Sequence, residues 1–304
     1  MSIPAAYIGV ILIWSTTPLA IKWSGDEVGF LFGAASRMAI SAVVAMLFVH
    51  LLRVKMPWHK PALHTYVAAG FGIYTAMLCV YWGAQYIPSG WVSVIFGLAP
   101  ITTGVLATIW LNEDAMTVNK IGGALLGVVG LMILFGGGDS LHNDMMAYGV
   151  VAVLLSTAFH SVSAVWVKRT NDGIHGLAVT AGGLLLSAPV FLLTWLMVDG
   201  VWPATIPTHV AWSIVYLSLC GSVLGFALYY YLLHHMEASR TALIALITPV
   251  TALLLGNQLN DEPMTMIIVI GTAFIALGLL CYEYGTKLFN RRHFKNEVEV
   301  EIKK

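Results

Sequence analysis

The chain has 304 residues, of which 59% are apolar and only 10% are charged, and its formal net charge is zero. Soluble proteins carry about 25% charged residues, and the mean hydropathy here is +0.83. This composition predicts an all-α polytopic membrane protein, with the lipid bilayer as its surroundings. It excludes a nucleic-acid-binding protein, because there is no excess of basic residues to neutralise a phosphate backbone.

Apolar segments long enough to cross about 30 Å of hydrocarbon follow one another along the whole chain. They are continuous and apolar on all sides, which favours a helical bundle over a barrel of alternating strands. We expect ten transmembrane helices, over residues 4–22, 29–52, 64–86, 88–111, 118–136, 145–168, 175–198, 209–233, 239–259 and 264–287.

The distribution of Lys and Arg predicts the orientation of these helices. Cytoplasmic loops of membrane proteins carry the excess of basic residues. With a cytoplasmic N-terminus, thirteen basic residues fall on the cytoplasmic side, Lys22 falls outside, and Arg37 lies within a helix. We therefore expect a plasma (inner) membrane protein with both termini in the cytoplasm.

An internal repeat connects two distant parts of the sequence. A shift of 149 residues aligns Tyr81 with Tyr230, Pro100 with Pro249 and Glu113 with Glu262, and a shift of 146 aligns Lys22 with Lys168. The repeat spans five helices, and because five is odd, the two copies must cross the membrane in opposite senses. We predict two inverted repeats, residues 1–138 and 139–288, followed by a cytoplasmic tail, residues 289–304.

The repeated blocks resemble a known family. They read PSGWVSVIFGLAPITTGVLATIWLNE and EASRTALIALITPVTALLLGNQLNDE, and they accompany IWSTTPLAIKW in the first helix and ASRMAI in the second. Together they are similar to the drug/metabolite transporter (DMT) superfamily, and to its EamA family in particular, over residues 4–288. The resemblance implies a carrier, often an exporter, of amino acids or related metabolites. It also implies that helices 1–4 and 6–9 surround a cavity that helices 5 and 10 support.

Candidate cavity residues are the polar and aromatic side chains near the middle of these helices, because such groups are costly in hydrocarbon unless they face a wet interior. The alternative for each aromatic residue is packing or an interfacial anchor. Arg37 either binds a substrate carboxylate or ties helices together through their carbonyls. The candidates are Trp14, Ser15 and Thr16, in a run that continues to Thr17, with Arg37, Tyr81, Gln85, His160, Trp166 and Tyr230.

The repeated prolines and glutamates form a second set of candidates. Pro100 and Pro249 are predicted to bend their helices near mid-membrane and so to act as hinges, with a static kink as the alternative. Glu113 and Glu262 fall at helix ends, where we expect capping and gate-loop roles. The glycines of residues 122–130 are predicted to pack against those of residues 271–278 rather than to bind a nucleotide.

The predicted function is a secondary transporter of small metabolites, amino acids above all, that works by alternating access as a monomer or homodimer. No carboxylate falls at mid-membrane, so we expect a facilitator or exchanger. The alternative is a proton-coupled carrier of amines or other small metabolites with His160 as its titrating group. No cofactor or metal site is implied, and a membrane-embedded enzyme is a distant alternative because no catalytic constellation is found.

Overall fold

The computed structural model describes residues 2–112, 118–136, 144–246, 248–278 and 280–281, and within these segments all regular structure is helical. The expected Glu113 and the tail from residue 289 lie outside the described residues. Seven of the described helices are long and apolar enough to cross a membrane. The protein is therefore a multi-pass membrane protein.

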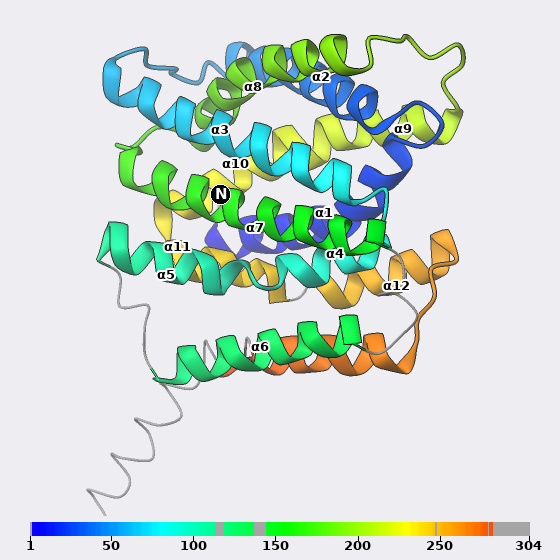
Figure 1. Cartoon of the computed structure of the whole chain (residues 1–304). Helices are drawn as coiled ribbons and strands as arrows, with labels where there is room; N and C mark the ends of the chain where they lie inside the picture. The colour runs from blue at the N-terminus through cyan, green and yellow to red at the C-terminus, as the bar shows by residue number, and fades with distance from the viewer. Residues whose placement is uncertain (1, 113–117, 137–143, 247, 279, 282–304) are drawn as a thin grey trace, which may run out of the picture.

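The helices follow the predicted spans closely (Figure 1). The first half of the chain forms α1 Ile3–Ser24, α2 Phe30–Leu51, α3 Lys60–Gly83, α4 Ser89–Phe96, α5 Ala99–Leu111 and α6 Val118–Gly136. The second half forms α7 Asp144–Thr170, α8 Gly176–Val198, α9 Thr208–Tyr216, the π-helix η2 Leu217–Leu224, α10 Gly225–His235, α11 Ala238–Thr241, the 3-10 helix η3 Ala242–Leu246, α12 Thr248–Asn260, and a last helix Met266–Gly278.

Three of the predicted spans are interrupted rather than continuous. One is divided into α4 and α5, one into α11, η3 and α12, and one contains the π-helix η2 between α9 and α10. Pro100 and Pro249 do not bend continuous helices as expected, because each lies at the second position of a new helix. A proline fits there without loss, since the first turn of a helix has no carbonyl for its amide.

The helices are arranged around α3 and α7, which lie side by side through the middle of the bundle (Figure 1). Helices α2 and α8 pack against each other and α8 also packs on α3, while α1 contacts both α10 and α12. Large apolar side chains such as Leu12 and Met197, which are 65% and 84% exposed, cover the outside. Such a surface suits lipid, because lipid tails do not oppose the exposure of apolar groups.

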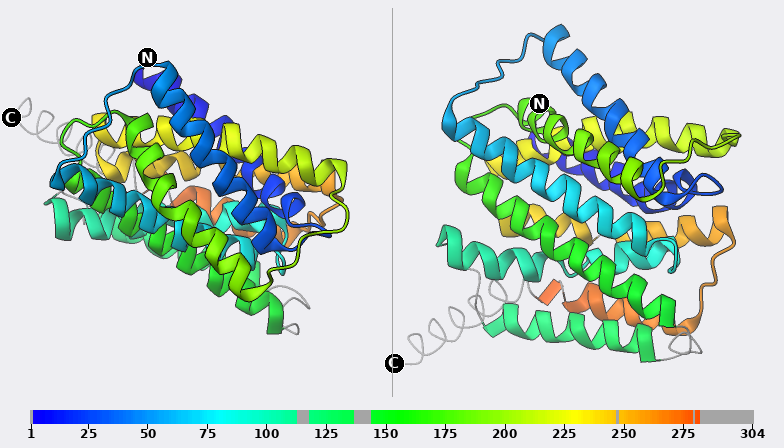
Figure 2. Two further views of the ribbon diagram at one scale, coloured as in Figure 1. Left: turned by 90° about the horizontal axis from the view of Figure 1, so that it is seen from above. Right: turned by 45° about the horizontal axis from the view of Figure 1, so that its top comes forward.

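Helix α6 and Met266–Gly278 lie together at one flank, and all three views show them side by side (Figures 1 and 2). Their glycines make the contact: a Cβ added to Gly130 would lie 2.6 Å from the carbonyl oxygen of Gly271, and one added to Gly278 would lie 2.5 Å from that of Gly123. The predicted packing of two glycine-containing helices is confirmed for these residues. Small residues allow helix backbones to approach this closely in a membrane.

This contact predicts that substitution of one glycine of the helix pair destabilises the protein and that substitution of another has little effect. Gly278→Ala should lower the free energy of unfolding by about 1–3 kcal/mol, because its methyl group would force two backbones apart. Gly122→Ala should have little effect, because no heavy atom lies within 4 Å of the added group. The midpoint of thermal unfolding in detergent measures both, and equal midpoints for the two variants would contradict the prediction.

Candidate functional site

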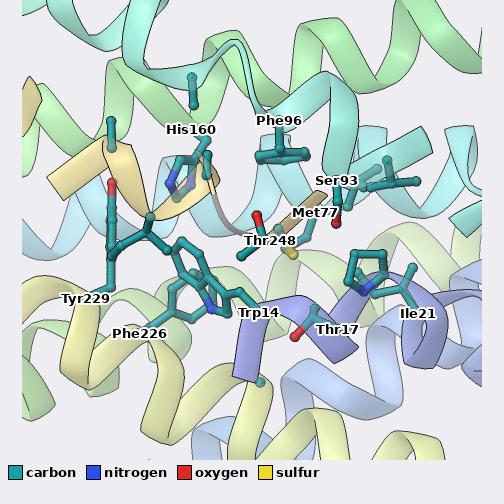
Figure 3. Close-up of a pocket in the computed structure, with 18 of the residues that line it drawn as sticks. Trp14, Thr17, Ile21, Met77, Ser93, Phe96, His160, Phe226, Tyr229 and Thr248 are labelled. Atoms are coloured by element: carbon teal, nitrogen blue, oxygen red, sulfur yellow. The ribbon is translucent and has the colours of Figure 1, made fainter. Parts of the chain in front are cut away.

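A central cavity lies where the interrupted helices meet, and its interior holds about 90 Å³ of space that the centre of a water molecule can reach. That is room for several waters or part of a small metabolite, since one water needs only about 10–15 Å³ by this measure. Residues of α1–α5, α7, η2, α10–α12 and η3 line it (Figure 3). None of its lining residues comes from α6, α8 or Met266–Gly278.

One wall of the cavity is aromatic (Figure 3). The ring centroid of Trp14 lies 4.9 Å from that of Tyr229, 5.7 Å from that of His160 and 6.2 Å from that of Phe226. Phe96, at the end of α4, lies 6.1 Å from His160 on the other side. These rings come from α1, α4, α7 and α10, so the aromatic wall depends on four helices meeting.

The helix interruptions contribute directly to the lining. Phe96 and Ala99 flank the break between α4 and α5, Ala242 and Ala245 belong to η3, and Gly221 belongs to the π-helix η2. Irregular backbone is tolerated inside a membrane only where it is buried in protein or lines a cavity. The backbone groups at the three interruptions therefore lie where the cavity can accommodate their polarity.

A buried cation, Arg37, joins the cavity from α2 and is only 1% exposed. Its Nε donates to Ser222 Oγ at 2.9 Å, and its Nη1 donates to the Tyr81 hydroxyl at 3.4 Å. The neighbouring turn is fixed by Ser41, whose Oγ donates to the carbonyl of Arg37 at 2.6 Å. Ser218 of the π-helix donates to the same carbonyl at 3.2 Å.

Two hydrogen bonds beside the cavity join pairs of residues that correspond to each other in the sequence repeat. The hydroxyls of Thr102 and Ser161 lie 2.6 Å apart, and Thr251 Oγ1 donates to Ser15 Oγ at 2.7 Å. Thr251 follows Thr102 by 149 residues and Ser161 follows Ser15 by 146. Each bond thus joins one half of the sequence to the other.

At one end of the bundle, Glu262 joins α1, α4 and α12. Its carboxylate accepts from the backbone N–H of Ser89 at 2.9 Å, from Ser89 Oγ at 3.0 Å and from the N–H of Gly90 at 3.3 Å. It therefore caps the N-terminus of α4, where the helix dipole favours an anion. Lys22 Nζ lies 3.5 Å from the same carboxylate and donates to the carbonyl of Ile87 at 3.4 Å. This Lys22–Glu262 cluster lies at the end of the bundle where α1 finishes.

A related contact lies at the opposite end of the bundle, where α7 finishes. Lys168 Nζ donates to the carbonyl oxygen of Leu233 at 3.0 Å and also to the carbonyl oxygen of Met236. Lys168 and Met236 correspond through the repeat shifts to Lys22 and Ile87. A lysine near the end of the first helix of each half thus binds a carbonyl in the connection that precedes a later helix, α4 or α11.

Of the cavity residues expected from the sequence, the structure brings Trp14, Arg37 and His160 to the lining. Tyr81 is buried behind them and holds Arg37. Ser15 is also buried behind the wall, where it bonds Thr251.

The other expected cavity residues lie away from the lining. Thr16 faces α9 and hydrogen-bonds the hydroxyl of Tyr216. Gln85 is exposed beyond the end of α3, so it shares no helical face with Tyr81. Trp166 packs against a ring of α3, and Tyr230 is buried against Phe226. Each of these side chains either lies off the helical face that lines the cavity or lies at a different depth along the bundle.

The lining also contains Thr17, from the predicted run on the first helix, and Tyr229, together with Phe96 and Phe226, which the sequence analysis did not select. Thr17 lies three residues after Trp14 and on the same helical face. The same spacing relates Phe226 to Tyr229. Phe96 carries no such signal, because its position depends on where α4 ends.

Interrupted membrane helices around a mid-span cavity are the construction of secondary transporters. Comparison with known families agrees: the sequence model of the EamA-like transporter family matches residues 2–136 and again residues 147–283. The chain belongs to the EamA-like transporter family. It is accordingly a transporter and not an enzyme.

Several relatives are similar over nearly their whole length. The uncharacterized transporter YoaV of Bacillus subtilis is 28% identical over 94% of this chain and 97% of its own length. A probable terminal-alkyne amino-acid exporter of Streptantibioticus cattleyicolor is 28% identical over 94% and 93%. The inner membrane transporter YedA of Escherichia coli is 24% identical over 93% and 91%.

A solved crystal structure shares the fold, with a TM-score of 0.71 over 93% of this chain and 98% of that chain. The two sequences are 19% identical, so the likeness concerns the fold alone.

The Lys22–Glu262 cluster predicts a strong effect for the neutral variant Glu262→Gln. The amide keeps the shape but loses the ion pair, and its NH₂ group cannot accept from the backbone N–H groups of α4. We expect the free energy of unfolding to fall by about 1–3 kcal/mol, measured by thermal unfolding in detergent.

The matched control is Glu237→Gln. That carboxylate forms a half-exposed pair with Arg240 at 2.9 Å, so its loss should change the free energy of unfolding by less than about 0.5 kcal/mol. If both variants unfold at the wild-type midpoint, Glu262 does not stabilise this end of the bundle.

Proposed function

We propose that the protein is a secondary transporter of small metabolites, amino acids above all, and that it works by alternating access between two inverted five-helix halves. The central cavity and the two matched hydrogen bonds beside it carry the proposal. A carrier of this kind needs one site that two similar gates can reach in turn, and an inverted repeat supplies two such gates.

The matched contacts support the inverted repeat. Thr102–Ser161 and Ser15–Thr251 correspond through the repeat shifts, and so do the lysine contacts Lys22–Ile87 and Lys168–Met236. The lysine contacts lie at opposite ends of the bundle, as expected for halves of opposite orientation.

The two separate family matches, close to the proposed halves 1–138 and 139–288, also support the inverted repeat. Ten transmembrane helices then place both termini on the cytoplasmic side of the plasma (inner) membrane.

The two ends of the cavity support a gating role for the interrupted helices. On the side of Glu262, a carboxylate holds the start of α4 against α1 and α12. Release of Lys22 and the α4 amides from this carboxylate would open that end. Pro100 and Pro249 lie at the starts of α5 and α12. At these points an interrupted backbone can rotate without breaking a continuous helix. We propose these breaks as the hinges.

The lining favours amino acids over phosphorylated substrates. It is largely apolar and aromatic, and Arg37 is the one charged side chain among the described residues that line it. A phosphate would need more than one basic group. One similar protein is named as an amino-acid exporter, which agrees with this substrate class.

The surroundings of His160 favour a facilitator or exchanger over a proton-coupled carrier. Its ring contacts Trp14, Phe96 and Tyr229, and none of the described lining residues is a carboxylate. A proton relay needs a chain of groups that can exchange protons. Among the residues described at this cavity, His160 lacks such neighbours.

The topology can be tested with alkaline phosphatase fusions, because this reporter is active only outside the cytoplasm. An odd number of helices in each half places residue 140 outside and residues 55 and 304 inside. We expect activity from a fusion after residue 140 and none from fusions after residues 55 and 304. Activity at residue 304, or none at residue 140, would contradict two five-helix halves.

The transport mode can be tested by solute counterflow in proteoliposomes, with a panel of amino acids and quaternary amines. We expect exchange that does not depend on an imposed pH gradient and that the folded His160→Ala variant retains. Gradient-driven accumulation that His160→Ala abolishes would instead establish the proton-coupled alternative. No counterflow of any compound by folded wild-type protein would count against the proposed function itself.

A further inference from the structure

Arg37 is a charged side chain buried in the middle of a membrane helix with only neutral partners. It is 1% exposed, and its two hydrogen bonds go to the hydroxyls of Ser222 and Tyr81. Its guanidinium carbon also lies 5.8 Å from the centroid of the Tyr81 ring. Among the described residues, none of the ion pairs includes Arg37. Its positive charge therefore lacks a carboxylate in the part of the chain that the structure describes.

Such an arrangement is costly unless something compensates it. A guanidinium does not lose its proton in a protein, and a buried cation in a membrane normally pairs with an anion or faces a wet cavity. Two of its five N–H donors are used by Ser222 and Tyr81, and Arg37 lines the central cavity. The remaining donors are the group in the lining best able to bind an anion. A guanidinium binds a carboxylate through two parallel hydrogen bonds.

Two glycines relate Arg37 to the aromatic wall. A Cβ added to Gly221 would lie 3.3 Å from Arg37 Nη2, and one added to Gly225 would lie 3.0 Å from Trp14 Nε1. Gly221 lies in η2, and Gly225 is the first residue of α10, four positions further along the chain. Arg37 and Trp14 thus pack closely against the backbone of one segment, at positions where a residue larger than glycine would press on them.

Hydroxyl groups complete the polar part of the lining. Thr17, Ser93 and Thr248 all contribute to it (Figure 3). Hydroxyl oxygens can accept hydrogen bonds from an ammonium group. No carboxylate of the described lining offers a stronger partner to a cation.

We propose that Arg37 is the carboxylate subsite of this transporter, and that the cavity selects compact substrates with one carboxylate beside an apolar or aromatic side chain. The side chain packs against Trp14, Phe226 and Tyr229, and the α-ammonium group lies among the hydroxyls. This inference rests on the proposed function and narrows it. Amines that lack a carboxylate, such as quaternary amines, are poor substrates.

Matched ligands test this specificity without any mutation. Phenylalanine and phenylalaninamide share the ring and the amino group and differ in the carboxylate. With wild-type proteoliposomes, we expect phenylalanine to compete in counterflow roughly tenfold to hundredfold better than its amide. In detergent, phenylalanine should raise the thermal unfolding midpoint and the amide should not. Equal competition and equal thermal shifts would overturn the proposal.

Variants then assign the preference to one residue. Arg37→Gln should abolish the preference for the acid while transport or binding of the amide remains, an outcome that a purely structural role would not produce. Arg240→Gln, which removes a surface cation paired with Glu237, should keep the wild-type preference. A folded Arg37→Gln protein that still prefers the acid would overturn the assignment. If Arg37→Gln does not fold, Arg37→Lys should reduce the preference, because an ammonium cannot form the bidentate pair.

The thermal measurement separates this inference from the proposed function. Stabilisation by phenylalanine and not by its amide, without any counterflow, would support the carboxylate subsite and contradict the transport of amino acids. Counterflow of both compounds alike would support a carrier and contradict the subsite.

Discussion

A peptide group in hydrocarbon has no water to bind, so a membrane-spanning chain must satisfy its N–H and C=O groups within its own helices or at a cavity. Most of this protein follows that requirement with long continuous helices. The three interruptions in the described residues, at 97–98, 217–224 and 242–246, all occur around the central cavity. The same constraint thus explains why the bundle is regular at its lipid surface and irregular at its centre.

Charged groups hold the ends of helices that neighbour the interruptions. Glu262 accepts three hydrogen bonds from the start of α4 and pairs with Lys22. Lys168 binds the carbonyls that end α10. These contacts are strong but reversible, because they join ions and dipoles rather than tightly packed apolar surfaces. They are the contacts that the proposed alternating-access cycle would break and re-form.

Arg37 shows how one buried charge can organise a site. Its hydrogen bond to Ser222 connects α2 to the π-helix η2, and its contact with Tyr81 connects α2 to α3. A cation held only by neutral groups keeps its attraction for an anion, because hydroxyls do not neutralise it. The cavity therefore combines a buried cation with an aromatic wall, the combination on which the proposed preference for small amphipathic substrates rests.

The sequence by itself determined the membrane class, the approximate bounds of the helices and the glycine contact of α6, because hydropathy and small-residue spacing act locally. It also singled out Trp14, Arg37 and His160, since polar groups in a span are costly. Only the tertiary structure decided the rest. The break at Pro100, the displacement of Gln85 from the cavity and the inclusion of Phe96 depend on where helices end and which face meets a neighbour. Those features arise from packing between segments far apart in the chain, which hydropathy along one segment does not record.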